Sequence, residues 1–228
     1  MSETPPLRIA GAVLTVLPEG AVWWEAERML IVADLHFEKG SSYAARGLAL
    51  PPYDTRATIS RLAALVTRLK PARLIALGDS FHDRAAESRM AEEDQAALAA
   101  LTQTTDWIWI TGNHDPVPPR RFGGAVHEEL TVGPLTFRHE PQPAPATGEI
   151  AGHLHPVAAV RVRGRRLRRR CVVSDSTRAI LPAFGAYAGG LNVLDDAYRP
   201  LLPATGFHAW LMGLRKVTPV AAARLESD

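Results

Sequence analysis

Three apolar runs, each ending in polar residues, constrain the fold of this chain more than any other feature. They cover residues 29–33, 74–77 and 107–110, and continuous apolar runs of this length indicate strands that are buried on both faces. A helix is predicted in each interval between them, one from Asp54 as N-cap to a stop at Pro71 and one over about residues 90–102. Parallel strands joined by helices align their C-terminal ends along one edge, where α/β proteins place their sites.

The other predicted elements are shorter. Residues 8–17 and 20–25 read as strands around a turn at 18–20, and residues 37–53 and 141–148 read as loops. Residues 126–132 and 135–137 are predicted strands, and an arginine-rich hairpin is predicted at about 157–173 with its turn near Gly164. Residues 215–228 carry no clear signal. We expect residues 1–228 to form a single domain.

Composition places the chain among globular proteins. It has 228 residues, of which 46% are hydrophobic, enough for a sizeable core. A single cysteine, Cys171, excludes an intramolecular disulfide and fits a reducing compartment. The N-terminal residues lack the pattern of a signal peptide, and no run of about 18 apolar residues exists. We therefore expect a cytoplasmic protein without a membrane segment, and the oligomeric state stays open.

The positive charge of the chain is concentrated in one segment. Residues 161–170 hold seven arginines and no acid, whereas the rest of the chain has 19 basic against 24 acidic residues. A local basic patch on an otherwise acidic chain favours an anionic partner, and DNA is the partner we expect. The alternative is a solvated ribbon without a partner.

Polar residues that bind metals collect at the predicted strand ends. They are Asp34, His36, Asp79, Asn113, His139, His153 and His155. Mixed oxygen and nitrogen ligands suit a pair of Mn²⁺, Fe²⁺ or Zn²⁺ ions better than Ca²⁺ or Mg²⁺. Residues two apart in an extended segment point to the same side. This predicts that Asp34 and His36 share one centre and that His153 and His155 share one, with Asp79 able to bridge two cations.

The order of these residues resembles the calcineurin-like metallophosphoesterases. Their five motifs are Asp-x-His, Gly-Asp-x-x-Asp, Gly-Asn-His-Asp/Glu, a lone His and Gly-His-x-His. They correspond here to residues 34–36, 78–83, 112–115, His139 and residues 152–155, with Phe81-His82 inside the second motif. The resemblance implies an αββα sandwich, in the α+β or α/β class, of two mixed sheets flanked by helices.

The resemblance also implies a role for each site residue. Asp34, His36 and His155 would hold one metal, and Asn113, His139 and His153 the other, with Asp79 between them. Two divalent cations, Mn²⁺ first and Fe²⁺ or Zn²⁺ as alternatives, would activate hydroxide for in-line attack on phosphate. His114 would stabilise the developing charge or protonate the leaving oxygen, and Asp115 would orient His114. Asp83 would support the site without binding metal.

Further segments resemble the ligase-associated DNA-damage-response phosphoesterases. These segments are residues 34–40, 46–47, 51–55 and 181–185. That resemblance implies a Mn²⁺-favouring phosphodiesterase or endonuclease that processes DNA in repair, with an ATP-dependent DNA ligase and a helicase-like protein as partners. The alternatives are a phosphoesterase acting on a small nucleotide or phosphate ester, and a non-catalytic repair scaffold.

Several charged residues are candidate substrate contacts. Lys39 and Arg46 are predicted to grip phosphate, and Arg165, Arg166, Arg168 and Arg169 to contact the nucleic-acid backbone. Solvated side chains are the alternative for all six. The remaining residues of note receive structural roles: His82, His127 and His208 as isolated histidines, and Trp107 and Trp109 as core aromatics.

Overall fold

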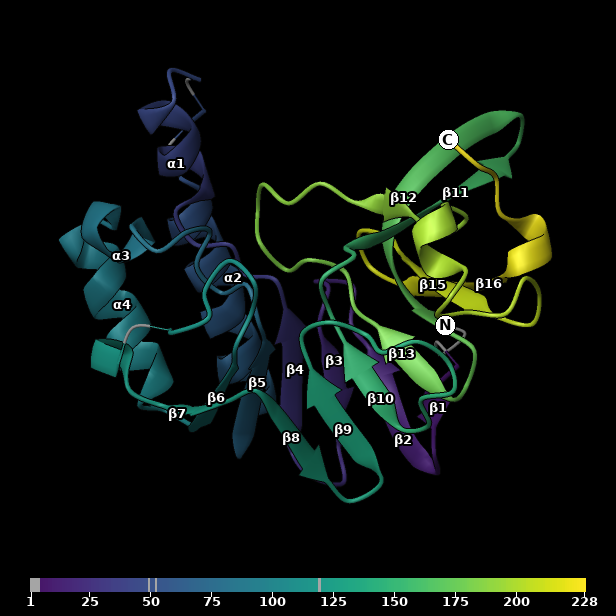
Figure 1. The fold of residues 1–228 in the computed structure, drawn as a ribbon, viewed down its shortest axis with the longest axis horizontal. Coiled ribbons are helices and arrows are strands. Elements are labelled where there is room, and N and C mark those ends of the chain that lie inside the picture. Colours follow the sequence, from purple (N-terminus) through teal and green to yellow (C-terminus); the bar gives the residue numbers. More distant parts are fainter. Residues whose placement is uncertain (1–4, 49, 52, 119) are drawn as a thin grey trace.

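The computed structural model describes residues 5–48, 50–51, 53–118 and 120–228, and two sheets form its centre (Figure 1). The first sheet has the order β1-β2-β3-β4-β5-β6-β7. Its strands are β1 (Leu7–Ile9), β2 (Ala12–Val16), β3 (Val22–Trp24), β4 (Met29–Ala33), β5 (Arg73–Leu77), β6 (Asp106–Ile110) and β7 (Ala125–His127). β4, β5 and β6 are parallel and in register, which confirms the three buried strands predicted from the apolar runs.

Helices cover the outer face of the first sheet. They are α1 (Lys39–Ala45), α2 (Asp54–Leu69), α3 (Ala86–Arg89) and α4 (Glu92–Thr102). The apolar residues of α2 and α4, such as Leu62 and Leu98, pack on Leu30 and Leu74 of the sheet. Within the described ranges, no helix has both the length and the apolar composition needed to cross a membrane.

The second sheet contains the arginine-rich hairpin. Its main order is β14-β11-β12-β13-β10-β9-β8, and β12 also pairs with β15, which pairs with β16. Its strands are β8 (Glu129–Val132), β9 (Leu135–Arg138), β10 (Glu149–Ala151), β11 (Pro156–Val162), β12 (Arg165–Ser174), β13 (Arg178–Ile180), β14 (Leu191–Asn192), β15 (His208–Met212) and β16 (Val217–Ala221). Three short 3-10 helices complete the described elements: η1 (Arg120–Phe122), η2 (Asp196–Tyr198) and η3 (Ala222–Arg224). The hairpin β11–β12 confirms the predicted turn near Gly164 and projects beyond the sheets (Figure 1).

The main core lies between the two sheets. Ile31 and Ile75 of the first sheet pack with Phe137 and Ile150 of the second, and all four are fully buried. Burying one such side chain stabilises the fold by about 1.5–3 kcal/mol. A third apolar cluster packs Tyr198 and its neighbours on the outer face of the second sheet. The sheets, with helices on the first and 3-10 segments on the second, form the expected αββα sandwich of two mixed sheets.

Four predicted boundaries were wrong. Residues 8–17 form two strands, because the chain turns at Ala10 and Gly11 with φ values of 47° and 87°. The predicted loop at 37–53 contains α1, and Ala49 and Pro52 in it lie outside the described residues. Residues 126–132 split between β7 and β8, which belong to different sheets. Asp54 is the first residue of α2, and no side chain caps that helix.

Candidate metal centre

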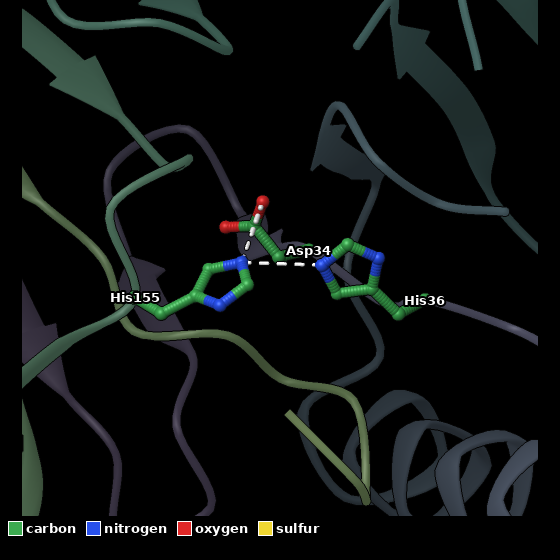
Figure 2. Close-up of side chains that lie close together, drawn as sticks. All are labelled: Asp34, His36 and His155. Carbon is green, nitrogen blue, oxygen red and sulfur yellow. Dashed lines mark hydrogen bonds and ion pairs between the residues drawn. The ribbon is translucent and has the colours of Figure 1, made fainter. Parts of the chain in front are cut away.

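The C-terminal ends of β4 and β5 meet the ends of β9 and β10, and this junction holds the first group of predicted ligands. Asp34, His36 and His155 point toward one another (Figure 2). The Nε2 atom of His155 lies 3.3 Å from Asp34 Oδ1 and 3.2 Å from His36 Nε2. Asp34 is completely buried and His155 is partly exposed. Donor atoms that face one another at these distances are arranged as the ligands of a single cation are.

A second group lies directly beside the first. Asp79, His139 and His153 form it, and His139 Nε2 lies 3.4 Å from Asp79 Oδ2 and 3.2 Å from His153 Nδ1. Asn113 adds a further donor, because its Oδ1 lies 2.9 Å from the same nitrogen of His139. The groups adjoin, since His139 Nδ1 is 3.7 Å from Asp34 Oδ1.

His153 and His155 belong to different groups, so the prediction that they share one centre was wrong. Side-chain alternation by two holds only for extended backbone, and here both residues have left-handed φ values of 71° and 48°. Asp34, His36 and Asp79 are left-handed as well, with φ values of 52°, 45° and 45°. The division of the histidines follows the pattern implied by the family resemblance.

A backbone contact determines which nitrogen of His139 faces the second group. Its Nδ1 lies 3.0 Å from the Leu77 carbonyl oxygen, which can only accept, so Nδ1 carries the hydrogen. Nε2 is therefore the ligand atom. Burial alone would lower the pKa of His139, but its hydrogen bond to Asp79 and the charges of Asp34 and Asp79 raise that pKa to about 9. A proton on Nε2 stands where a cation would be held.

The charge states of the other ligands also suit cations. Burial alone would raise the pKa of Asp79, but the hydrogen bond and charge of His139 lower it to about 2. Burial and the electrostatic interaction with the neighbouring His155 lower the pKa of His36 to about 2. An ionised carboxylate and a neutral imidazole are the forms that bind metal. The two groups therefore fit two divalent transition ions, each held by carboxylate and imidazole donors.

Glycines allow the motifs to approach one another closely. A Cβ atom on Gly112 would overlap the backbone nitrogen of Asp79, and a Cβ on Gly78 would lie 2.5 Å from the His139 ring. Only glycine avoids these collisions without moving a ligand.

His114 lies at the rim of the site and faces the ligands without joining them. Its Nδ1 is 2.7 Å from the carbonyl oxygen of His82, so Nδ1 carries the hydrogen. Its Nε2 lies 3.9 Å from Asp79 Oδ2, and 41% of its side chain is exposed. The backbone N–H of His114 donates to Asp79 Oδ1 at 2.9 Å. This position suits a group that acts on a bound substrate.

Asp115 does not orient His114, which corrects the predicted role. Its Oδ2 accepts hydrogen bonds from the backbone N–H groups of Ser80 at 2.9 Å and Phe81 at 3.1 Å. Burial and the negative charge of Asp79 raise the pKa of Asp115 to about 7. Asp115 therefore ties the loop after β6 to the loop after β5, and the His82 carbonyl orients the His114 ring instead.

Sequence reasoning missed His82, whose ring lies in the site. It stacks on the His114 ring with centroids 5.3 Å apart and lies 5.5 Å from the His36 ring. Burial and the positive charge of Lys39 lower the pKa of His82 to about 4. Its position inside the second motif was the feature of the sequence that could have identified His82 as a site residue.

Nearby charged residues surround the site in different ways. Asp83 accepts two hydrogen bonds from Arg89, at 2.9 and 2.8 Å, so it joins α3 to its own loop and binds no ligand residue. Lys39 and Arg46 lie close enough for their charges to contribute to the lowered pKa of His82, after burial. Both are thus placed at the α1 side of the site, where they were predicted to contact substrate.

Polar residues at the starts of α1 and α2 hold α1 in place. Thr55 donates its hydroxyl hydrogen to Glu38 Oε1 at 2.8 Å, and the Gly40 N–H donates to Asp54 Oδ2 at 2.9 Å. These bonds cross from the start of α1 to the start of α2. These residues therefore position α1 beside the metal groups.

The arginine hairpin is partly neutralised. Arg166 and Arg168 donate to Asp228 at 2.8 and 3.2 Å, and Arg161 donates to Glu226 at 2.9 Å. Arg165 and Arg169, which were also predicted to contact nucleic acid, form no ion pair with the described residues.

One protein family and one solved structure establish the class of enzyme. The calcineurin-like phosphoesterase family matches residues 27–168. The structure is similar to the Pseudomonas putida nuclease MPE, with 33% identity and a TM-score of 0.72 over 94% of this chain and 98% of that chain. Similarity to AQ665 of Aquifex aeolicus, a protein of unknown function, has 18% identity and a TM-score of 0.40 over 56% and 78% of the two chains. The E. coli phosphoesterase YfcE has 14% identity and a TM-score of 0.42 over 85% and 98%. A comparison with curated proteins gave no match.

Proposed function

Because the chain belongs to the calcineurin-like phosphoesterases and is a metal-dependent hydrolase of phosphate esters, we propose that it is an endonuclease that cleaves DNA. The observation that carries the choice of a nuclease is the similarity to a nuclease along 94% of the chain, and the choice of DNA follows the sequence resemblance of residues 34–40, 46–47, 51–55 and 181–185 to DNA-repair phosphoesterases. The position of His114 supports a large substrate, because its side chain is 41% exposed at the rim of the site.

The carboxylate, amide and imidazole side chains of the two groups would hold the metal ions in place. Two divalent cations, for which we propose Mn²⁺ with Fe²⁺ or Zn²⁺ as alternatives, would activate water and neutralise phosphate charge when bound. Asp34, His36 and His155 would hold one, and Asn113, His139 and His153 the other. Asp79 would lie between them, since it contacts the second group and its negative charge also acts on His36.

His114 completes the proposed reaction. Its Nδ1 hydrogen is bound to the His82 carbonyl, so Nε2 is the ring atom that faces the ligands and a bound substrate. As an imidazolium, the ring would donate its Nε2 hydrogen to a phosphate oxygen or to the leaving oxygen. Lys39 is the proposed additional phosphate contact, at the start of α1.

The activity is tested with purified protein and Mn²⁺. Circular single-stranded DNA is the informative substrate, because it has no ends and only an endonuclease can linearise it. We expect cleavage, and we expect Asp79→Ala to abolish it while His208→Ala, at the exposed first residue of β15, retains it. Cleavage that survives Asp79→Ala would indicate a contaminant and refute the proposal.

The same assay separates the alternatives. Hydrolysis of 4-nitrophenyl phosphate without cleavage of DNA would favour an enzyme acting on small phosphate esters. Absence of bound metal by elemental analysis, even after addition of Mn²⁺, would favour a non-catalytic scaffold.

We also propose a cytoplasmic role in DNA repair beside an ATP-dependent DNA ligase and a helicase-like protein. The support is the sequence resemblance in residues 34–40, 46–47, 51–55 and 181–185. A strain that lacks the gene should be more sensitive to DNA-damaging agents, and unchanged survival would contradict the repair role.

A further inference from the structure

A large groove lined by arginines lies next to the hairpin. It has a volume of about 980 Å³ and lies between α2, the β2–β3 turn, β12 and the β15–β16 turn. We call it the basic groove, and its lining residues are Pro18, Glu19, Arg68, Arg168, Arg169, Arg170, Met212, Gly213, Leu214 and Arg215. Five arginines face a single acid in this groove, so its net charge is strongly positive.

The groove holds arginines that lack an acidic partner. Arg169 donates only to the carbonyl oxygen of Arg168, at 2.9 Å, and Arg215 forms no hydrogen bond or ion pair with any part of the chain that the structure describes. Both are exposed. Arg68 and Arg168 of the groove are paired with Glu19 and Asp228, and Arg161 and Arg166 near the tip of the hairpin are paired with Glu226 and Asp228. Arg169, Arg170 and Arg215 therefore carry the charge of the basic groove that is available to an anion.

Arg170, one of the residues that line the groove, lies close to the metal centre. β11 begins directly after His155, and Arg170 pairs across the hairpin with Val157. Two residues along a strand and one step across place the backbones of His155 and Arg170 about 8 Å apart. Arg170 also donates to the carbonyl oxygen of Ala183 at 3.0 Å, and Ala183 pairs with Ala33, which precedes a ligand of the first group.

The side of the metal centre at Asn113 and His139 is acidic. A smaller cavity there is lined by three glutamates, Glu128, Glu129 and Glu140, and Arg138 in the same lining is paired with Glu129 at 2.8 Å. Phosphate groups are repelled there and attracted on the side of the basic groove. The charge distribution therefore favours a bound polyanion that runs from the metal centre toward the basic groove.

We propose that the basic groove binds the phosphate backbone of a DNA strand whose cleaved phosphate lies at the metal centre. This inference rests on the proposed nuclease function and adds the path of the strand. Arginine forks grip phosphate oxygens in pairs, and such contacts position a strand without reading its sequence. The groove then determines affinity for long substrates, and a small phosphodiester does not reach it.

The test compares two double variants that each lose two positive charges. Arg169→Ala/Arg215→Ala removes the two exposed arginines of the groove that form no ion pair with the described residues. Arg73→Ala/Arg199→Ala is the matched control, because the partly exposed Arg73 and the exposed Arg199 pair with Asp106 and Asp196 elsewhere on the molecule. Binding of a labelled single-stranded oligonucleotide is followed by fluorescence anisotropy across a salt series. Hydrolysis of bis(4-nitrophenyl) phosphate reports the state of the metal centre in every variant.

We expect the groove variant to bind the oligonucleotide at least about tenfold more weakly, with a salt slope smaller by about 1.4 for two lost phosphate contacts. The control should stay within about twofold of the wild type, and Arg169→Lys/Arg215→Lys should keep the salt slope because it keeps the charge. Unchanged oligonucleotide binding in the groove variant would overturn the inference while leaving nuclease activity intact. A loss of bis(4-nitrophenyl) phosphate hydrolysis in that variant, equal to its loss of binding, would also overturn it. If the wild type cleaves no DNA, the proposed function fails, and the anisotropy comparison still decides whether the groove binds a strand.

Discussion

The adjacent residues Asn113 and His114 should separate cation binding from turnover. Asn113 Oδ1 lies 2.9 Å from the ligand nitrogen of His139, within the second group. His114 lies at the rim of that group, with its Nε2 3.9 Å from Asp79 Oδ2 and its Nδ1 bound to a backbone carbonyl. One substitution to alanine at each position therefore removes a ligand in one case and a substrate-facing proton donor in the other.

The expected magnitudes follow from these contacts. Asn113→Ala leaves three of the four donors of the second group, so we expect the Kd of one Mn²⁺ to rise at least about tenfold. His114→Ala removes a charged hydrogen bond and general acid catalysis, so we expect kcat to fall about 100- to 1,000-fold. The Kd for Mn²⁺ in His114→Ala should stay within about twofold of the wild type.

Two measurements on each variant test this division. Calorimetric titration of the metal-free protein with Mn²⁺ gives occupancy, and hydrolysis of bis(4-nitrophenyl) phosphate across a Mn²⁺ series gives turnover. Added Mn²⁺ should restore much of the activity of Asn113→Ala and none of the activity of His114→Ala. Equal loss of Mn²⁺ in both variants would refute the assignment of His114 to the substrate.

Other outcomes follow from individual contacts. Mn²⁺ should bind about tenfold more tightly per pH unit between about pH 7 and 9, because a proton competes for His139 below its raised pKa of about 9; a pH-independent Kd in calorimetry would contradict this. Gly112→Ala should lower the free energy of unfolding by about 1–3 kcal/mol, because the added Cβ meets the Asp79 backbone; an unchanged thermal melt would show that the loop yields freely. Glu149→Ala should cost about 3–5 kcal/mol, since it leaves Arg178, 1% exposed and 3.2 Å away, as an unpaired buried charge. That loss corresponds to a Tm lower by about 6–20 °C in calorimetry. Replacing Arg178 by Met in the same protein should recover most of it, and no recovery would argue against the ion pair as the cause.

The central strands and the ligand set were predictable because they depend on local sequence. Residues 29–33, 74–77 and 107–110 are apolar throughout, and runs of this length are typical of strands buried on both faces. The ligands follow these strands or later ones, in motifs with fixed spacing. Which histidine joins which group was not predictable from spacing, because the backbone at His153 and His155 is left-handed.

Elements that depend on distant contacts were not predictable. α1 lacks an apolar periodicity, and bonds to residues of α2, including the bond from Gly40 to Asp54, hold it in place. Residues 126–132 read as one strand, yet the chain passes from one sheet to the other near Glu128. Asp115 follows His114 in sequence, but its carboxylate is directed to the backbone of a different loop, at Ser80.

The left-handed backbone at five ligands has a consequence for evolution and engineering. Aspartate and histidine tolerate this conformation better than most residues, but glycine adopts it without steric cost. Replacing a ligand such as Asp34, at φ 52°, with glycine would therefore relax the backbone of the metal-free protein while removing a donor atom. Stability and metal binding thus favour different residues at the same positions. A library screened for thermal stability in the presence of a chelator should accumulate glycine there and lose its catalytic centre before its fold.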